Sequence, residues 1–240
     1  MLCVYDKFTK QNEFNNCGIR ILKPLSFYTY EELNGDYSVE IKYPITQDDD
    51  AWKFLLPYNI VRNSENQLFF IYDCYTEDDI LTAQARHIFY YLADKQIYEC
   101  KYKDFNCGYA LSAIKDHTEI NWGLVPESNF IEYDFSFSTD LNDKLYNIDY
   151  HGVNPVYALI GASDSIVNIY GGEIHRDNFR YSINKRKEGS KSDAFDIRSG
   201  FNMLSVRERI NTENLVNVMH TEDNYGQGYS GGYSTTDYCP

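Results

Sequence analysis

Apolar and polar residues alternate along the first part of the chain with the period of two that is typical of a half-buried strand. In residues 37–43, tyrosine, valine and isoleucine take every second position, with serine, glutamate and lysine between them. The Asn-Gly pair at 34–35 supplies the turn chemistry of a β-hairpin. Further strands are predicted at residues 68–75 and 80–85, and a short helix at 87–94. These elements predict a β-meander closed by a helix, which is a plausible plan for a small barrel.

The middle of the chain shows helical spacing instead. Residues 109–114 place apolar side chains on one helical face, with Asp104 as the expected N-cap. A second helix is predicted to begin at Asn154, and a third to end at Gly171. One alternating strand, residues 129–139, lies between the first two helices. This segment is therefore predicted to be an α+β insertion between β-rich flanks.

Alternation returns after residue 172. Two strands are predicted on either side of an Asp-Asn turn at residues 177–178. Three more follow, at residues 193–200, 202–211 and 214–222. The last stretch, residues 223–240, holds four glycines and four tyrosines without apolar periodicity. Such a segment buries too little surface to offset its ordering entropy, so we predict a flexible tail.

The order of these patterns predicts a β-rich α+β fold class. We expect an N-terminal β domain at residues 1–98 and a peripheral α+β insertion at residues 99–172. A C-terminal β domain is expected at residues 173–220, followed by the flexible Gly/Tyr tail at residues 221–240.

The amino-acid composition favours β-strands and limits the kinds of partner that the chain can bind. Of the 39 aromatic residues, 23 are tyrosine, a bias that favours β-structure. The formal net charge of -14 makes the chain a poor clamp for nucleic acid, which binds through lysine and arginine. An acidic wall would, however, let DNA slide past without sticking. No apolar run approaches the roughly 20 residues of a membrane span, and the first residues do not resemble a signal peptide. We expect no membrane insertion and no export by a leader.

Motifs that would hold a metal, a cofactor or a nucleophile are missing from the sequence. The six cysteines form no CxxC pair, and the five histidines show neither HExxH nor HxH spacing. No GxxxxGKS/T occurs, and the glycine-rich string GQGYSGG at residues 226–232, which contains the letters of GxGxxG and GxSxG, sits in the predicted tail, where nothing would hold it. We therefore predict no catalytic residue, no cofactor, no metal site, and reduced cysteines in a protein made in the cytosol.

Weaker arrangements leave alternatives open. A Cys/His hydrolase could combine Cys17 or Cys107 with His117 or His151. A glycosidase could use a pair of the 36 acidic residues, whose separation only the fold would set. The acidic runs TQDDDA and TEDDI could ligate calcium, but neither has EF-hand spacing, so solvated loops are expected there.

Three basic residues stand together in this acidic chain: Lys185, Arg186 and Lys187. They end the predicted hairpin that contains the Asp-Asn turn. One interpretation is a solvated turn. The other is a contact with an acidic partner or a sister subunit, because a patch of one sign on an oppositely charged chain steers association.

Three sequence segments, which follow one another in the order of a known family's motifs, resemble that family. Residues 31–45, EELNGDYSVEIKYPI, resemble the pattern E-x-N-G-x-Y-x-L-x-x-x-Y-P. Residues 85–92 resemble A-x-H-I-x-Y-D-L, with Tyr91 where the pattern has aspartate. Residues 171–189 resemble G-G-E-x-x-x-D-N-F-x-V-x-L-x-x-x-R-G. Over residues 1–220 the chain is thus similar to the N-terminal hub region of siphophage and prophage tail-tip proteins, the prophage endopeptidase tail or minor structural protein family.

The resemblance implies a fold like the baseplate hub of contractile phages. Two barrel-like β domains, one from each end of the chain, would be separated by a peripheral α+β domain, and three copies would form a ring that closes the tail tube. The implied location is the virion tail tip, after synthesis in the host bacterial cytoplasm. Implied partners are other copies of the chain, the distal tail protein, and the tail tube or tape-measure protein. DNA would pass through the lumen without specific binding.

Family members often carry a peptidoglycan-cleaving or receptor-binding extension, so a downstream receptor-binding or lysin domain is a further expected partner. No catalysis is carried over to residues 1–240. The leading hypothesis is a structural, non-enzymatic hub. The alternatives are a cell-wall hydrolase and a carbohydrate-binding module whose tyrosine rings stack on sugars.

Overall fold

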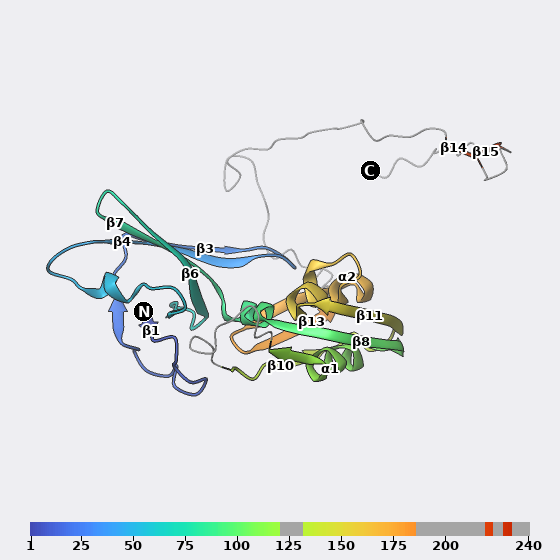
Figure 1. The fold of residues 1–240 in the computed structure, drawn as a ribbon, viewed down its shortest axis with the longest axis horizontal. Coiled ribbons are helices and arrows are strands. Elements are labelled where there is room, and N and C mark those ends of the chain that lie inside the picture. The colour runs from blue at the N-terminus through green and yellow to red at the C-terminus, as the bar shows by residue number, and fades with distance from the viewer. Residues whose placement is uncertain (121–131, 186–218, 223–227, 232–240) are drawn as a thin grey trace, which may run out of the picture. The chain divides into compact units, whose positions relative to one another are not determined.

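The computed structural model describes residues 1–120, 132–185, 219–222 and 228–231 (Figure 1). The chain divides into two compact units, Met1–Glu188 and Gly189–Pro240. The strands predicted at residues 193–200 and 202–211 lie outside the described residues, as does most of the strand predicted at 214–222.

The first unit begins with a seven-stranded antiparallel sheet in the order β2-β1-β5-β6-β7-β4-β3 (Figure 1). Its strands are β1 (Leu2–Tyr5), β2 (Arg20–Leu22), β3 (Ser26–Glu31), β4 (Tyr37–Pro44), β5 (Ile60–Arg62), β6 (Leu68–Glu77) and β7 (Ile80–His87). The order is open, with β2 and β3 at its two edges, so closure into a barrel is not part of the described architecture. The predicted β-meander is confirmed as a sheet.

Burial along β4 follows the predicted alternation. Tyr37, Val39, Ile41 and Tyr43 are buried, and the residues between them are partly exposed. The buried set packs with β6, β7 and the short helix η1 (Ala51–Phe54) in one hydrophobic core. Since period-two burial is set by the strand backbone itself, the sequence pattern was sufficient to predict this element.

The two ends of the sheet differ in how they are covered. At the β1–β5 end, neighbouring residues pack in different hydrophobic cores, one on each face of the sheet. Val4 and Val61 pack in the core that contains β4, and Cys3 and Ile60 pack in the other core. At the opposite end, β3 has a burial pattern of partly exposed and exposed residues only. The sheet is therefore sandwiched at one end and half-covered at the other.

The rest of the first unit is an α+β region. It starts with the 3-10 helix η2 (Ile88–Asp94), which confirms the short helix predicted there. The remaining elements are β8 (Lys95–Phe105), α1 (Cys107–Asp116), β9 (Thr118–Ile120), β10 (Ser136–Thr139), β11 (Tyr146–Val153), η4 (Tyr157–Gly161), α2 (Ile166–Tyr170), β12 (Gly172–Asp177) and β13 (Arg180–Lys185). They form two three-stranded sheets, ordered β11-β8-β9 and β10-β13-β12.

The predicted helices exist, but the N-cap of the first one differs. Asn106, not Asp104, caps α1, because its side-chain oxygen accepts the Tyr109 N–H at 2.9 Å. Asn154 accepts the Tyr157 N–H at 2.8 Å, as expected, and the turn that follows is of the π type. Gly171 ends α2 in the left-handed conformation, with a φ of 73°.

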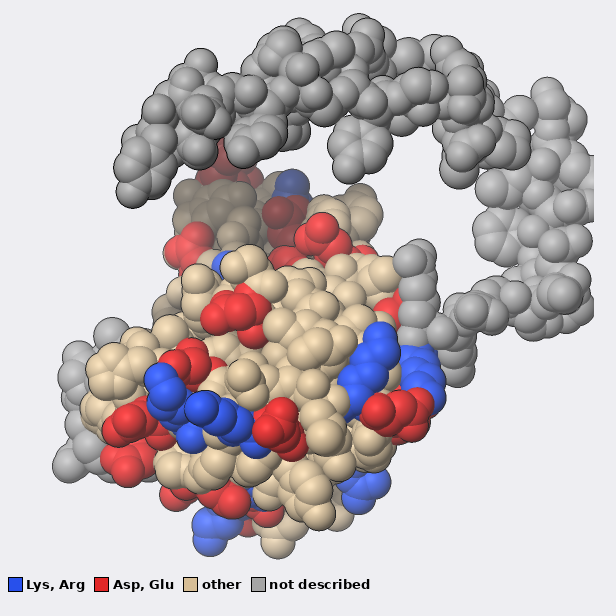
Figure 2. All heavy atoms as spheres, turned by 90° about the vertical axis from the view of Figure 1, so that its right-hand side faces the viewer, with Lys and Arg blue, Asp and Glu red and all other residues tan. Residues whose placement is uncertain are grey.

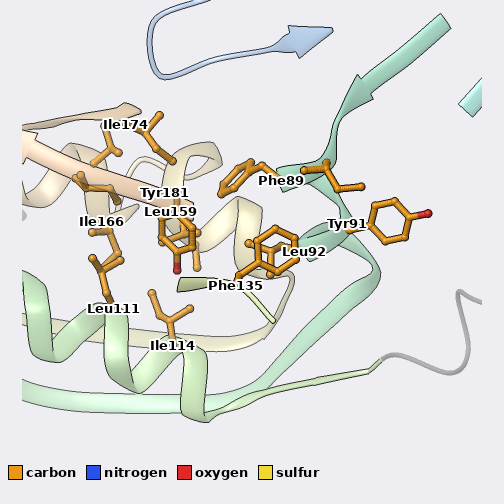
Figure 3. Packing of buried hydrophobic residues seen from close by; sticks show 14 of the residues in the cluster. Phe89, Tyr91, Leu92, Leu111, Ile114, Phe135, Leu159, Ile166, Ile174 and Tyr181 are labelled. Atoms are coloured by element: carbon orange, nitrogen blue, oxygen red, sulfur yellow. The ribbon is translucent and has the colours of Figure 1, made fainter. Parts of the chain in front are cut away.

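A second hydrophobic core fills this region (Figure 3). Leu111 and Ile114 of α1 lie opposite Tyr181 of β13 and Ile166 of α2, while Phe89 and Leu92 enter from η2 (Figure 3). Helix α2 and strand β12, on either side of the predicted domain boundary at residue 172, share this core. The predicted division of the chain into domains stays a prediction.

The described part of the second unit is one antiparallel hairpin of β14 (Met219–Glu222) and β15 (Gly228–Gly231). Strand β14 falls within the strand predicted at residues 214–222. Strand β15 lies inside the predicted Gly/Tyr tail, for which no element was expected. Backbone pairing satisfies N–H and C=O groups without apolar periodicity, so that pattern gave no signal for it.

Candidate functional site

Of the three basic residues that were predicted to contact a partner, the structure describes only Lys185. Lys185, at the end of β13, donates its backbone N–H to Asp140 Oδ1 at 2.6 Å, and its ammonium group pairs with Asp143. The hydrogen bond to Asp143 raises the pKa of Lys185. Arg186 and Lys187 lie outside the described residues. The charge of Lys185 is thus matched within the chain, and a partner contact at this cluster stays a prediction.

The residues of the Cys/His alternative are not brought together in the described part of the chain. Cys107 is buried at the start of α1, where burial raises the pKa of its thiol, and this opposes use as a nucleophile. His117 instead contacts the Tyr102 hydroxyl at 2.7 Å through Nε2. Cys17 and His151 are exposed, on a loop of the first sheet and on β11 respectively. The five described cysteines are all free.

The acidic run TQDDDA is engaged in local contacts. Asp49 accepts hydrogen bonds from the Tyr43 hydroxyl at 2.6 Å and the Ala51 N–H at 2.9 Å, and Asp50 lies 3.5 Å from Arg20. Among the described residues, no group of three histidine, cysteine or acidic side chains could hold a metal ion.

Carboxylates also line a cleft of about 460 Å³ beside α1. Glu132 lies 3.5 Å from Lys95, and Asp134 lies 2.9 Å from Lys115. Each carboxylate therefore faces a lysine. Charges of both signs are also interspersed on the face shown in Figure 2, at the end of the molecule that carries α1, β8 and β11.

The most developed polar arrangement is a buried network that joins the first sheet to β12 and its turn. Arg176, on β12, has a side chain that is 1% exposed. Its guanidinium donates to the Gly35 carbonyl oxygen at 2.6 Å and to the Glu32 carbonyl oxygen at 3.3 Å. It also contacts the Tyr90 hydroxyl at 3.0 Å and lies over the Tyr37 ring at 5.3 Å. The turn between β3 and β4 is therefore held by an arginine about 140 residues further along the chain.

Asn34, in the same turn, pairs with the backbone of β12. Its side-chain oxygen accepts the Ile174 N–H at 2.8 Å, and its Nδ2 donates to the Gly172 carbonyl oxygen at 3.1 Å. With a φ of 56°, Asn34 also adopts the left-handed conformation that asparagine tolerates. The predicted Asn-Gly turn thus serves as a docking element as well as a hairpin turn.

Replacing Asn34 with glycine is expected to lower the free energy of unfolding by about 2 kcal/mol, because two hydrogen bonds of about 1 kcal/mol each are lost. Glycine keeps the left-handed turn, so the change isolates the side-chain contacts. Urea denaturation followed by circular dichroism measures the effect. A loss below about 0.5 kcal/mol would show that Asn34 does not hold β12.

A second set of hydrogen bonds joins the turn between β12 and β13 to the first sheet. Asn178 accepts the Leu68 N–H at 2.8 Å and donates from Nδ2 to the Asn66 carbonyl oxygen at 3.0 Å. Its own backbone N–H donates to Gln67 Oε1 at 3.2 Å, and Gln67 Nε2 donates to Asp177 Oδ1 at 3.1 Å. The predicted Asp-Asn turn therefore caps the turn between β5 and β6.

We call these contacts the polar joint. It comprises Asn34, Gly35, Gln67 and Tyr90 on the sheet side, and Arg176, Asp177 and Asn178 on the hairpin side. Besides the two predicted turns, the sequence offered one signal for it: Arg176 lies two residues after Ile174, on the inward face of a predicted strand. An arginine in such a position must find buried partners.

No family model matches the chain, and no curated protein matches it significantly. Among solved structures, the chain is similar to the crystal structure of prophage tail protein gp18 from Listeria monocytogenes EGD-e. The two share 20% sequence identity with a TM-score of 0.59, over 96% of this chain and 67% of the other.

This chain has the fold of a prophage tail protein. The resemblance expected from the sequence is thereby confirmed at the level of a phage tail fold, and membership of the hub family stays a prediction. Within the part of this tail fold that is described, no helix has the length and apolar content needed to cross a membrane.

Proposed function

We propose that this chain is a structural protein of a phage or prophage tail, acting as a hub at the tail tip. The observation that carries the proposal is the tail-protein fold, matched along 96% of the chain. In this role the chain forms a ring that closes the tail tube and anchors downstream fibre or lysin modules. Its working location is the virion tail tip, beside the distal tail protein and the tube or tape-measure protein.

The exposed edge of the first sheet supports this proposal. Strand β3 is an edge of the first sheet, and its Tyr28 and Tyr30 side chains are 54% and 56% exposed. Edge strands are natural surfaces for pairing with another chain, and cyclic closure removes them. Three copies, each contributing two barrel-like β domains, would form the ring, and the net charge of -14 suits a lumen that DNA passes without binding.

We expect a trimer, or a monomer–trimer equilibrium, in light scattering of the purified chain at high concentration. Tyr30→Lys places a charge on the β3 edge and is expected to shift that equilibrium toward the monomer. Tyr109→Lys is the matched control, because Tyr109 is 65% exposed on α1, away from the sheet edge, and should leave the assembly intact. A clean dimer would contradict the trimeric ring.

The proposal assigns no bond-breaking step to residues 1–240. The described Cys/His candidates do not meet, and the cleft carboxylates Glu132 and Asp134 face lysines. Incubation with purified peptidoglycan is therefore expected to release no soluble fragments. Release that disappears in a variant of one acidic residue or cysteine would establish the hydrolase alternative instead.

A further inference from the structure

A histidine lies at the centre of the polar joint. His87, the last residue of β7, is 0% exposed, and its ring stacks on Tyr37 with centroids 4.7 Å apart and planes 12° apart. Its Nδ1 accepts the Phe89 N–H at 3.3 Å, at the start of η2. Its Nε2 lies 3.1 Å from Gln67 Oε1.

These contacts fix the protonation state of the ring. Gln67 Oε1 accepts the Asn178 N–H, and Gln67 Nε2 donates to Asp177, so the amide orientation of Gln67 is set by its other partners. His87 Nε2 must then donate to Gln67, while Nδ1 carries no hydrogen because it accepts the Phe89 N–H. The closed joint therefore holds His87 as the neutral Nε2–H tautomer.

The charges around His87 oppose a second proton. Arg176 and His175, both on β12, act on the ring with the same sign as an imidazolium. The carboxylates whose charge acts on the stacked Tyr37 are Glu31 of β3, Glu65 of the β5–β6 turn and Asp177 at the end of β12. Among the described residues, none of these carboxylates hydrogen-bonds to the histidine ring. Burial, followed by Arg176, lowers the pKa of His87 to about 3.

We propose that the polar joint is an acid-sensitive latch, in which protonation of His87 releases the β12–β13 hairpin from the first sheet. A proton taken from solvent onto Nδ1 would set two donors, Nδ1–H and the Phe89 N–H, against each other. It would also add a positive charge near the buried guanidinium of Arg176. Opening the joint brings water to the ring and relieves both conflicts.

Gln67 connects the ring to the hairpin. Its Oε1 is shared by His87 and the Asn178 backbone, and its Nε2 holds Asp177. Movement of the His87 ring therefore disturbs the same amide that fixes the β12–β13 turn. The latch acts at the contact between the two parts of the unit, where the His87 ring packs on Tyr37 and Phe69 at the border of the first sheet's core.

The sign of the pH dependence follows from linkage. The closed joint lowers the pKa of His87 from the ordinary 6.5, which it regains once the joint opens. The free energy that favours closure is fully present above pH 6.5, and it declines as pH falls from 6.5 toward 3. Between pH 7.5 and pH 5.0 the equilibrium constant for opening should rise about thirtyfold.

Hydrogen exchange of the intact chain, followed by mass spectrometry and corrected for intrinsic exchange rates, tests this latch. The amides of Leu68, Ile174 and Asn178 donate to side chains of the joint and report on its opening. We expect their protection to fall about thirtyfold between pH 7.5 and pH 5.0. Amides of the paired strands β8 and β11 should keep theirs.

Two variants assign the effect. His87→Gln removes the titrating group and should abolish the pH-dependent difference in protection. His175→Gln, at the exposed position of β12 next to Arg176, should retain that difference. Constant protection of the joint amides in the unmodified protein would overturn the proposal, whether or not His87→Gln folds. An equal loss of amide protection in β8 and β11 would also overturn it, as would a pH response that persists in His87→Gln.

Discussion

Replacing Arg176 with methionine is expected to lower the free energy of unfolding by about 3 kcal/mol, the largest effect of any single charged residue in the polar joint. The guanidinium makes two hydrogen bonds to backbone carbonyls, at Gly35 and Glu32, from a side chain that is 1% exposed. Hydrogen bonds from a charged group contribute about 1.5 kcal/mol or more each when buried. Methionine fills part of the volume but offers no donor.

Urea denaturation of the variant and the unmodified chain, in the same buffer, measures the change. Arg86→Met, on β7 of the first sheet, is the control for loss of an exposed arginine. Arg86 lies 3.9 Å from Asp36, and both side chains are about half exposed, so its loss should cost less than about 1 kcal/mol. Equal effects of the two substitutions would show that burial of Arg176 contributes nothing to stability.

Gly18→Ala is expected to destabilise the chain by about 2–5 kcal/mol. Gly18 has a φ of 64°, which costs an alanine roughly 1–2 kcal/mol. A Cβ at this position would also lie 2.2 Å from the Val4 carbonyl oxygen, in the backbone of β1. Because β1 is hydrogen-bonded on both sides, that oxygen cannot retreat without disturbing the sheet, and overpacking of this kind costs about 1–3 kcal/mol more.

Gly171→Ala separates the two contributions. Gly171 has a similar φ of 73°, but nothing lies within 4 Å of a Cβ built there. Its substitution should cost only the conformational part, about 1–2 kcal/mol. Thermal unfolding of both variants compares them directly. If Gly18→Ala destabilised the chain no more than Gly171→Ala, the inference that a Cβ at Gly18 collides with the backbone of β1 would be wrong.

Elements set by local pattern were predictable from the sequence, as β4 and the β12–β13 hairpin show. Strand β8 was missed because its burial does not alternate. In β8 the two buried residues, Ile97 and Cys100, are three positions apart, and the pairing of β8 with β11 shifts register between Tyr146 and Ile148. An irregular register removes the period-two signal on which strand prediction depends.

The polar joint could be predicted only in part. Its turns, at Asn34-Gly35 and Asp177-Asn178, carry strong local signals. Their partners do not, because the Arg176 guanidinium meets the Gly35 carbonyl across 141 positions of sequence. A backbone carbonyl has no residue-type signature, so no pattern in the chain could name it. Gln67 and His87 likewise accept backbone N–H groups, those of Asn178 and Phe89, which have no residue-type signature either.

That separation in sequence has a consequence during synthesis. Arg176 leaves the ribosome 144 residues after Glu32, whose carbonyl oxygen it contacts. At translation rates of about 5–20 residues per second, the nascent β3–β4 turn waits roughly 7–30 s for its arginine. During that interval the β3–β4 turn lacks its guanidinium and β12, and the β5–β6 turn lacks Asn178. The N-terminal sheet is thus completed late, by a segment translated long after its own last strand.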